Sequence, residues 1–316
     1  MFDVLIVGLG AAGYSAAIYT ARYKLKTCLV GMEEGGLGIT AAEVGNWPGD
    51  IEIKGPELME KFKKHALSFP DLTHKVARVE KIEKTDGGFR ATLGDGQSVE
   101  AKAVILATGS SKRHLKVPGE KEFAGKGVSY CATCDAFFFR GKTVAVIGGG
   151  DAAVEGAAIV AQVAKKVYLI HRRNEFRAEP YWVERVKARD NVTLVLERSV
   201  KEIHGDVKVT GITLDKPFEG QEKLALDGVF VEIGSLPSSE LAKGMGAELD
   251  AAGFITVREN MGTTVPGVFA AGDVTNGSNN FAQFVTGAGE GAVAANSVFA
   301  FLQGDGEGMG AMEGGD

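Results

Sequence analysis

The chain contains the same strand–turn–helix–strand pattern twice, at a constant offset of 140 residues. The first copy covers Asp3–Val30 and the second Thr143–Ile170. Each copy starts with an apolar strand, passes through a glycine-rich turn into a helix of small residues, and ends in a second apolar strand. This order is typical of the βαβ unit that binds the pyrophosphate of a dinucleotide. A repeat in identical register therefore predicts an α/β protein with two Rossmann-like dinucleotide-binding domains.

Both turns carry the small residues that such a unit needs. These residues are Gly8, Gly10 and Gly13 in the first copy, and Gly148, Gly150 and Ala153 in the second. The first position permits a sharp turn, the second lets the backbone approach the phosphates, and the third lets the helix pack on the strand. The pyrophosphate is then expected at the positive end of the helix. One such turn can arise for packing alone, whereas two matched copies favour nucleotide binding.

The residues that follow the second strand differ in charge between the copies. In the first copy Glu33 stands where an acid can accept hydrogen bonds from an unphosphorylated ribose. The equivalent position at +140 is Arg173, with Arg172 and Arg177 nearby, and guanidinium groups bind a 2′-phosphate that an acid would repel. We therefore expect FAD in the first domain and NADPH in the second. Ordinary surface charge is the alternative for the arginines and for Glu33, which has Glu34 beside it.

Two later apolar strands, over 103–109 and 267–273, also end in small or acidic residues. The carboxyl ends of parallel strands line the ligand crevice of a doubly wound sheet, where an acid can bind a ribose or ribityl hydroxyl. We assign the residues at these two strand ends to the FAD site: Thr108, Gly109, Gly272 and Asp273. The small-residue segment Thr286–Ala295 predicts a helix whose start approaches the flavin.

The simplest domain layout inserts the NADPH-binding domain into a discontinuous FAD-binding domain. The FAD-binding domain is expected over 1–114 and 245–303, and the NADPH-binding domain over 115–244. The segment 304–316 is rich in glycine and acids and has too little apolar pattern to fold, so it predicts a flexible tail.

Two cysteines separated by two residues stand just before the second repeat, in Cys131-Ala-Thr-Cys134-Asp135. Such a pair can close a small disulfide and carry two electrons. Residues 132–135 are expected to form one helical turn, whose amides favour a thiolate at Cys131. Asp135 is either an acid/base for thiol–disulfide exchange or a capping or surface acid. A dithiol beside a nucleotide unit predicts a redox enzyme.

Zinc binding and an inert core pair are the alternatives for these cysteines. A zinc site with this spacing needs two more ligands, but the five histidines are scattered and the third cysteine, Cys28, falls on a predicted buried strand. We therefore predict no metal site.

Composition argues against several classes of protein. The net charge is -6 and the chain has no run of Lys or Arg, which argues against nucleic-acid binding. No segment reaches the ~20 apolar residues of a membrane span, and the N-terminus does not read as a signal peptide. Three cysteines are too few for a disulfide-stabilised scaffold. We expect a cytoplasmic protein that binds neither nucleic acid nor membrane.

These features together resemble the low-molecular-weight thioredoxin reductases, along the chain to about residue 303. The matching motifs are Gly31-Met-Glu-Glu-Gly-Gly36, Glu43-Val-Gly-Asn46-Trp47-Pro48-Gly49, Cys131-Ala-Thr-Cys134-Asp135, His171-Arg172-Arg173 with Phe176-Arg177-Ala178, and Phe269-Ala-Ala-Gly272-Asp273-Val274. The resemblance implies a homodimer with FAD and NADPH domains in the layout given above. It also adds Asn46 and Gln283 to the FAD site.

The resemblance further implies a reaction in which NADPH reduces FAD and the flavin then reduces the disulfide. Cys134 is the thiol nearest the flavin, Cys131 attacks the disulfide of a thioredoxin-like protein, and Asp135 is the acid/base. The inserted domain rotates between the two half-reactions, with hinges near 115 and 244.

Two positions depart from the family pattern. The family usually has Gln where this chain has Leu37, and Arg where it has Ala282, and the loop 275–281 is a little longer here. The polar contacts of the flavin are therefore expected to change, with an effect on flavin potential, domain docking or partner choice.

Three other functions remain as alternatives. A ferredoxin or flavodoxin is an alternative electron donor to thioredoxin reduction, but it leaves the arginine cluster without a 2′-phosphate to bind. Small disulfides or oxygen are alternative acceptors. A dinucleotide-binding redox sensor without turnover, in which the cysteines are structural, is the alternative outside enzymes.

Overall fold

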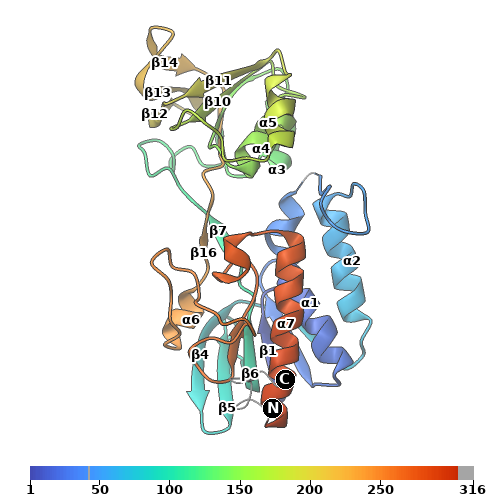
Figure 1. Ribbon diagram of the computed structural model, residues 1–316. Helices are drawn as coiled ribbons and strands as arrows, with labels where there is room; N and C mark the ends of the chain where they lie inside the picture. Colours follow the sequence, from blue (N-terminus) through green and yellow to red (C-terminus); the bar gives the residue numbers. More distant parts are fainter. Residues whose placement is uncertain (42, 305–316) are drawn as a thin grey trace, which may run out of the picture. The chain divides into compact units, whose positions relative to one another are not determined.

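The computed structural model describes residues 1–41 and 43–304, and its chain divides into two compact units (Figure 1). Unit 1 consists of Met1–Ser111 and Pro237–Asp316, and unit 2 of Lys112–Leu236. Unit 2 is thus inserted between the two parts of unit 1. The tail predicted over 304–316 lies outside the described residues from 305 onward.

Unit 1 is built on a sheet of seven strands, among the residues described, in the order β3–β2–β1–β6–β5–β4 with β17 also paired to β6. Its strands are β1 (Phe2–Val7), β2 (Thr27–Gly31), β3 (Thr73–Val76), β4 (Val79–Thr85), β5 (Gly88–Leu93), β6 (Ser98–Leu106) and β17 (Val268–Ala270). β1 pairs in parallel with β2 and β6, whereas β4 and β5 extend the sheet in antiparallel. The central strands are apolar runs because helices or loops cover both faces of the sheet.

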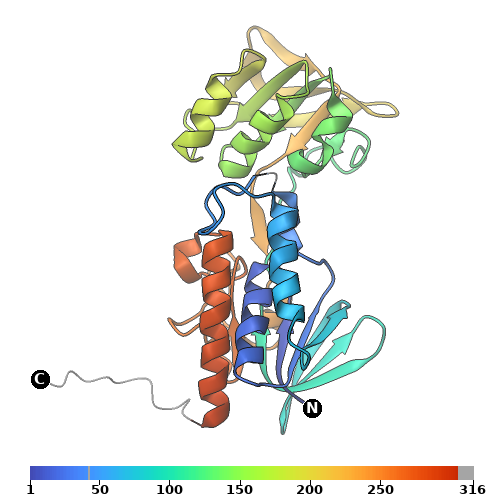
Figure 2. The same cartoon turned by 90° about the vertical axis from the view of Figure 1, so that its right-hand side faces the viewer.

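Three helices of unit 1 lie side by side along one face of this sheet (Figure 2). They are α1 (Ala11–Arg22), α2 (Gly55–Leu67) and α7 (Phe284–Gln303), and the shorter helices are η1 (Gly36–Thr40), α6 (Glu240–Gly244) and η3 (Gly277–Asn280). Val4 and Ile6 of β1 pack with the three long helices, whereas Leu5 and Val7 face a second core. α1 and α7 approach closely enough for the Ser15 hydroxyl to donate to the Ala288 carbonyl at 2.6 Å.

Unit 2 contains a parallel sheet in the order β11–β10–β9–β15–β8 and an antiparallel sheet in the order β12–β13–β14. Its strands are β8 (Val128–Ser129), β9 (Thr143–Ile147), β10 (Lys166–His171), β11 (Val192–Leu196), β12 (Val200–Gly205), β13 (Val209–Phe218), β14 (Gln221–Ala225) and β15 (Gly228–Val231). Its helices are α3 (Ala132–Asp135), η2 (Ala136–Phe139), α4 (Asp151–Val160) and α5 (Pro180–Lys187).

The chain passes between the units along β7 (Ser110–Lys112) and β16 (Ser235–Pro237), which pair with each other. The second boundary therefore lies before the expected one at 244. The reason is that α6 belongs to unit 1, where Ala242 is buried with Val79 and Ile82 of β4.

The two predicted repeats fold alike and keep the same strand register. Val4 pairs with Thr27 and Val7 with Val30 in unit 1. At +140, Val144 pairs with Val167 and Ile147 with Ile170 in unit 2. The predicted α/β architecture with two Rossmann-like units is therefore confirmed.

Candidate active site

The first glycine-rich turn joins β1 to α1. Gly8 has φ of 126°, a conformation that L-residues rarely adopt, and a Cβ there would lie 2.0 Å from the Ala107 carbonyl oxygen. A Cβ at Gly13 would lie 1.9 Å from the carbonyl oxygen of Gly8, whereas no atom lies within 4 Å of the Cβ position of Gly10. Gly8 and Gly13 therefore close the turn, and Gly10 leaves open space at the start of α1 that fits a pyrophosphate.

The second turn joins β9 to α4 with the same geometry. Gly148 has φ of 149°, and a Cβ there would lie 2.1 Å from the Glu232 carbonyl oxygen. The Cβ position of Gly150 again has nothing within 4 Å. The third position is Ala153, which is fully buried, so this turn accommodates one methyl group more than the first.

Glu33 and Glu34 follow β2 and lie beside the first turn, because the Gly35 amide donates to the Leu9 carbonyl at 2.8 Å. Glu34 pairs with Lys63 at 2.7 Å, and this hydrogen bond lowers the pKa of Glu34. Glu33 is exposed and has no ion pair with any described residue. Of the two acids, Glu33 is therefore the one whose carboxylate is available to accept hydrogen bonds from a ribose.

Asn46 and Gln283, 237 residues apart, meet in unit 1: the Asn46 amide Nδ2 donates to Gln283 Oε1 at 3.0 Å. Gln283 is also the N-cap of α7, and it forms a capping box with Thr286. The fold thus places these two predicted FAD-binding side chains together at the start of α7.

Asp273 follows β17 in a turn that a second acid holds in place. Glu290 of α7 is buried, and its carboxylate accepts hydrogen bonds from the Gly272 amide at 2.7 Å and the Thr275 hydroxyl at 3.2 Å. Burial raises the pKa of Asp273, and the charge of Glu290 raises it further. Sequence reasoning missed Glu290, although it is the one charged residue in the otherwise small and apolar helix 284–303.

Thr108 and Gly109 follow β6 and are hydrogen-bonded to Ser238, where the chain re-enters unit 1. The Thr108 hydroxyl donates to the Ser238 carbonyl at 2.7 Å, and the Ser238 amide donates to the Gly109 carbonyl at 2.9 Å. Their polar groups are therefore engaged with backbone at the carboxyl end of the sheet.

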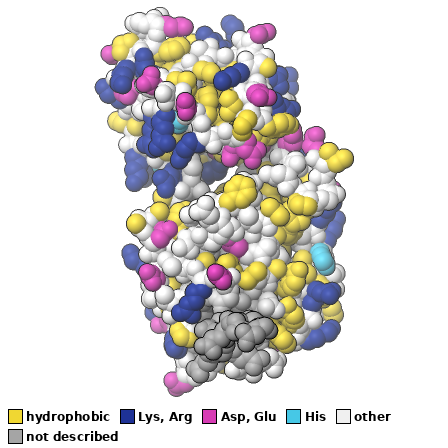
Figure 3. Space-filling view, in the orientation of Figure 1, with side chains coloured by type: hydrophobic (Ala, Val, Ile, Leu, Met, Phe, Trp, Pro, Cys, Tyr) yellow, Lys and Arg dark blue, Asp and Glu magenta, His cyan; other side chains and the backbone are white. Residues whose placement is uncertain are grey.

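The three arginines predicted to bind a 2′-phosphate are exposed and follow β10. Their positive charges all act on one neighbour, His171, whose pKa is lowered mainly by burial and also by Arg173, Arg177 and Arg172. Figure 3 shows Lys and Arg side chains gathered beside a histidine on the surface of unit 2. The fold therefore brings the arginines to one place.

His171 connects this cluster to the second glycine-rich turn. Its ring stacks on Phe176 with centroids 5.6 Å apart, and it lies so close to Gly149 that a Cβ there would clash with the ring. The Arg177 amide donates to the Gly149 carbonyl at 2.7 Å. The buried Nε2 of His171 has no hydrogen-bond partner, and a buried polar atom of this kind needs one.

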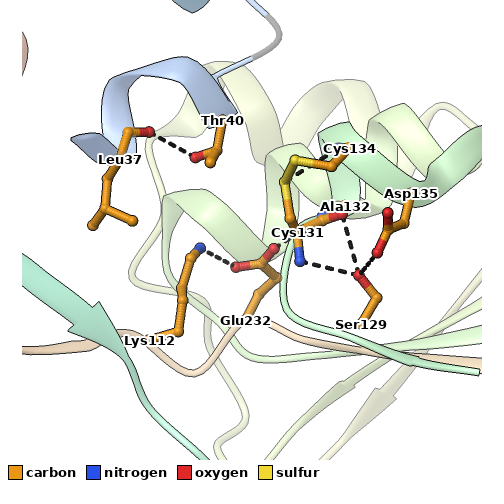
Figure 4. A network of polar contacts seen from close by, with 9 residues as sticks. All are labelled: Leu37, Thr40, Lys112, Ser129, Cys131, Ala132, Cys134, Asp135 and Glu232. Atoms are coloured by element: carbon orange, nitrogen blue, oxygen red, sulfur yellow. Dashed lines mark hydrogen bonds and ion pairs between the residues drawn. A yellow bond between two sulfur atoms is a disulfide. The ribbon is translucent and has the colours of Figure 1, made fainter. Parts of the chain in front are cut away.

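Cys131 and Cys134 are joined by a disulfide, with their Cα atoms 5.3 Å apart (Figure 4). Cys131 is the N-cap of α3, the predicted helical turn, and the Cys134 amide points at the Cys131 sulfur at 3.2 Å. α3 packs on α4 at Gly156, where a Cβ would lie 2.9 Å from that of Ala132. The disulfide is therefore held against the helix that starts at the second nucleotide turn.

Asp135 is hydrogen-bonded rather than free at the surface. The buried Ser129 hydroxyl donates a hydrogen bond to Asp135 Oδ2 at 2.6 Å and accepts one from the Cys131 amide at 3.1 Å. Ser129 thus links the acid to the backbone of the first cysteine, and sequence reasoning missed it because a lone serine on a short strand has no distinctive pattern.

A second carboxylate, also missed, reaches the disulfide turn from the end of β15. Glu232 is buried, and its carboxylate accepts hydrogen bonds from the Ala132 amide at 3.1 Å and from Lys112 Nζ at 2.8 Å (Figure 4). An acid directly after a buried strand was the pattern that identified Asp273, and it would have identified Glu232 as well.

Two large apolar side chains stand exposed directly after the disulfide turn. Phe137 is 68% and Phe138 77% exposed. They are therefore candidates for an apolar contact with another molecule.

Both positions that depart from the family pattern lie in unit 1. Leu37 is half-buried in η1, where its carbonyl accepts the Thr40 hydroxyl at 2.8 Å (Figure 4). Ala282 is exposed after a loop in which Ser278, Asn279 and Asn280 all have positive φ. Three successive left-handed residues give this longer loop a backbone course of its own before Gln283.

The remaining cysteine, Cys28, is fully buried on β2, and burial raises the pKa of its thiol to about 11. Among the residues described, no three His, Cys, Asp or Glu side chains gather as a metal site would require. In the same part of the chain, every helix is too short or too polar to cross a bilayer.

Comparison with known proteins identifies relatives along nearly the whole chain. The family model described as pyridine nucleotide-disulphide oxidoreductase matches residues 2–292. A thioredoxin reductase of Mycolicibacterium smegmatis is 44% identical over 300 residues, which cover 93% of this chain and 94% of that protein. A glucosaminate ammonia-lyase of Pseudomonas fluorescens is 42% identical over 303 residues, covering 92% and 93%. The crystal structure of Lactococcus lactis thioredoxin reductase, in a form described as the FR conformation, has a TM-score of 0.91 at 35% identity and covers 96% of this chain and 100% of that one.

Proposed function

Because the chain belongs to the pyridine nucleotide-disulphide oxidoreductase family, we propose that it is an NADPH-dependent thioredoxin-disulfide reductase that contains FAD. One observation carries this proposal: the Cys131–Cys134 disulfide lies on a turn that packs against the helix of a dinucleotide-binding unit. A disulfide in that position accepts two electrons and two protons and becomes two thiols.

FAD is assigned to unit 1. The open space at Gly10 fits its pyrophosphate, the free carboxylate of Glu33 fits a ribose, and Asp273 fits a ribityl hydroxyl. Asn46 and Gln283 complete the set at the start of α7. A bound flavin supplies two-electron transfer between a nicotinamide and a disulfide.

NADPH is assigned to unit 2. Arg172, Arg173 and Arg177 converge around His171, and guanidinium groups recognise a 2′-phosphate by charge-assisted hydrogen bonds. The space at Gly150 fits the pyrophosphate. The nucleotide turn and the dithiol both belong to unit 2, so they are expected to take turns at a flavin held in unit 1, with β7 and β16 as the hinges.

In the dithiol itself, Cys131 is proposed as the thiol that attacks the disulfide of the protein substrate, and Cys134 as the thiol that faces the flavin. Attack forms a mixed disulfide, and the Cys134 thiolate then displaces the second substrate thiol. Asp135, oriented by Ser129, accepts and returns the proton during this exchange.

The proposed substrate is a thioredoxin-like protein rather than a small disulfide. The exposed Phe137 and Phe138 lie directly after the dithiol turn and offer an apolar contact that a protein surface fits better than a small molecule does. We further propose that the protein is a cytoplasmic homodimer, for which sedimentation at two concentrations is the direct measurement.

The dithiol and the arginine cluster support this proposal over the other activities. A redox-active cysteine pair is the chemistry of disulfide reduction, and lyase chemistry does not require it. An enzyme that takes electrons from ferredoxin or flavodoxin has no 2′-phosphate for the three arginines to bind.

An NADPH oxidation assay with the host's thioredoxins, each tested separately, examines donor and acceptor together. NADPH is expected to bleach the flavin absorbance, and an oxidised thioredoxin to restore it with stoichiometric formation of thiols. The Cys134→Ser variant should keep flavin bleaching but lose thioredoxin reduction by at least about 1,000-fold, because one thiol cannot complete the exchange. Full thioredoxin reduction by this variant, or equal use of NADH and NADPH by the parent, would contradict the proposal.

A further inference from the structure

The fold gives Ala107 and Glu232 equivalent places in the two units. Each follows the strand beside the central strand of its sheet, and each amide donates to the last residue of that central strand, at 2.8 and 2.9 Å. Their carbonyl oxygens would lie 2.0 and 2.1 Å from a Cβ on Gly8 and Gly148. Unit 1 therefore has a methyl group where unit 2, which carries the dithiol, has a carboxylate.

The Glu232 carboxylate is buried and fully engaged. One oxygen accepts the Ala132 amide at 3.1 Å, and the other pairs with Lys112 Nζ at 2.8 Å (Figure 4). The side chain of Glu232 is 5% exposed and that of Lys112 26%. Because a buried carboxylate is costly without a partner, the ion pair with Lys112 offsets the cost of burying Glu232.

This ion pair acts on the first peptide group after Cys131. Amides at the start of a helical turn stabilise a thiolate on the preceding cysteine. The Cys134 amide points at the Cys131 sulfur, but the Ala132 amide points at Glu232 instead. Glu232 therefore fixes the first peptide group of the turn and places a negative charge beside it, which Lys112 offsets.

We propose that the Glu232–Lys112 pair positions the disulfide turn and sets the reduction equilibrium of Cys131–Cys134. This inference rests on the proposed function only in that the pair of cysteines is redox-active. Neutralising Glu232 leaves the Lys112 charge and favours the reduced dithiol, which makes the disulfide a stronger oxidant. Neutralising Lys112 leaves the Glu232 charge and favours the disulfide.

The test is a thiol–disulfide equilibrium measured on the full-length, FAD-loaded protein in glutathione buffers. Two glutathione thiols are oxidised to one glutathione disulfide as the Cys131–Cys134 disulfide becomes two thiols, which are then alkylated and counted by peptide mass spectrometry. Glu232→Gln should raise the equilibrium constant for reduction about three- to tenfold, tenfold being about 30 mV for two electrons. Lys112→Met should lower it by a similar factor, and the double variant should lie within about twofold of the parent.

A second ion pair on the same sheet supplies matched controls. Lys142 and Asp227 lie 3.9 Å apart, and Asp227 precedes β15 whereas Glu232 follows it. Asp227→Asn and Lys142→Met make the same changes of charge away from the disulfide turn, and should leave the equilibrium constant within about twofold of the parent.

A Glu232→Gln protein with an unchanged equilibrium constant would overturn the inference, as would single variants that shift it in the same direction. FAD content and the thermal midpoint show whether each variant folds. If Glu232→Gln does not fold, Lys112→Met alone tests the inference. The measurement uses neither NADPH nor thioredoxin. It can therefore be interpreted even if the protein proves not to reduce thioredoxin with NADPH.

Discussion

The two nucleotide units share one turn and differ in what surrounds it. Gly8 and Gly148 have the same unusual backbone, and the Cβ positions of Gly10 and Gly150 both face open space. The neighbouring residues diverge, with Glu33 after β2 and Arg173 after β10 at equivalent places. The repeated turn therefore leaves the same open space in both units, and the residues around it are the ones proposed to select the nucleotide.

The acids at the strand ends differ in the same way. In unit 1, Asp273 lies near a second carboxylate, Glu290, whose charge raises the pKa of Asp273. In unit 2, Glu232 is paired with Lys112 and bonded to the disulfide turn. In unit 1 the two acids lie near each other after β17, whereas unit 2 directs its carboxylate to the disulfide turn.

The largest expected difference between the units concerns the third position of the turn. Gly13→Ala would place a Cβ 1.9 Å from the Gly8 carbonyl oxygen, so the turn must open and the protein should be purified without FAD. Ala153→Gly removes a methyl group at the start of α4 and should cost only about 0.5–1 kcal/mol of stability, with the KM for NADPH within about threefold of the parent. Flavin absorbance and thermal unfolding measure both, and a yellow, stable Gly13→Ala protein would show that the two turns are interchangeable.

An intermediate effect is expected from the arginines. Replacing Arg172 and Arg173 with Ala removes charge-assisted hydrogen bonds worth about 1.5–3 kcal/mol each, so KM for NADPH should rise at least about tenfold. KM for NADH and the FAD content should stay near the parent values, because neither depends on a 2′-phosphate. Steady-state kinetics with both nucleotides measures this difference. An equal rise in KM for both would mean that the cluster stabilises unit 2 rather than selecting its nucleotide.

The smallest effect concerns the acids of unit 1 and depends on pH. Because burial and Glu290 raise the pKa of Asp273, folding disfavours its ionised form, and the stability contributed by the protonated form is lost as pH rises through the folded pKa. FAD-free Asp273→Asn should therefore melt about 2–4 °C above the parent at pH 7. This gain should shrink toward pH 3.8, the ordinary pKa of the group, below which the parent carboxyl is protonated in both states.

Glu34 provides the control of opposite sign for this pH series. Its pKa is lowered by Lys63, so Glu34→Gln should slightly destabilise the protein at pH 7 and lose that effect as pH falls. Thermal melts of FAD-free protein between pH 4 and 8 compare the two variants. Parallel curves would show that the two acids have similar surroundings.

Periodic and local features of the protein were predictable from the sequence. The two βαβ units, their register and the helical turn at 132–135 were predicted and are confirmed, because apolar strands and glycine turns are encoded within short segments. The assignments of individual residues to FAD, NADPH and catalysis stay predictions. Among them, the fold places Asn46 beside Gln283 and the three arginines around His171.

The residues that sequence reasoning missed support the site through long-range contacts. Ser129 contacts Asp135, Glu290 contacts Gly272, and Glu232 contacts both Ala132 and Lys112. Ser129 and Glu290 are single polar residues in irregular or apolar segments, so no spacing or period identifies them. Glu232 stands directly after a buried strand, a pattern that identifies a candidate acid but not the groups that it contacts. The second boundary of the inserted unit was also placed too late, because the packing of α6 against β4 is a contact between distant segments.

By itself, the sequence determined that this protein has two dinucleotide-binding units, which of them carries the basic cluster, and that a dithiol precedes the second. Glycine turns and the charge of the residues that follow each repeat are local properties, so they can be read in order along the chain. Only the tertiary structure decided that the carboxylate after β15 is directed to the first amide beyond Cys131, because strand pairing brings together residues that are 100 positions apart. The physical reason is burial: a carboxylate removed from water must find partners, and the fold determines which donors are within reach.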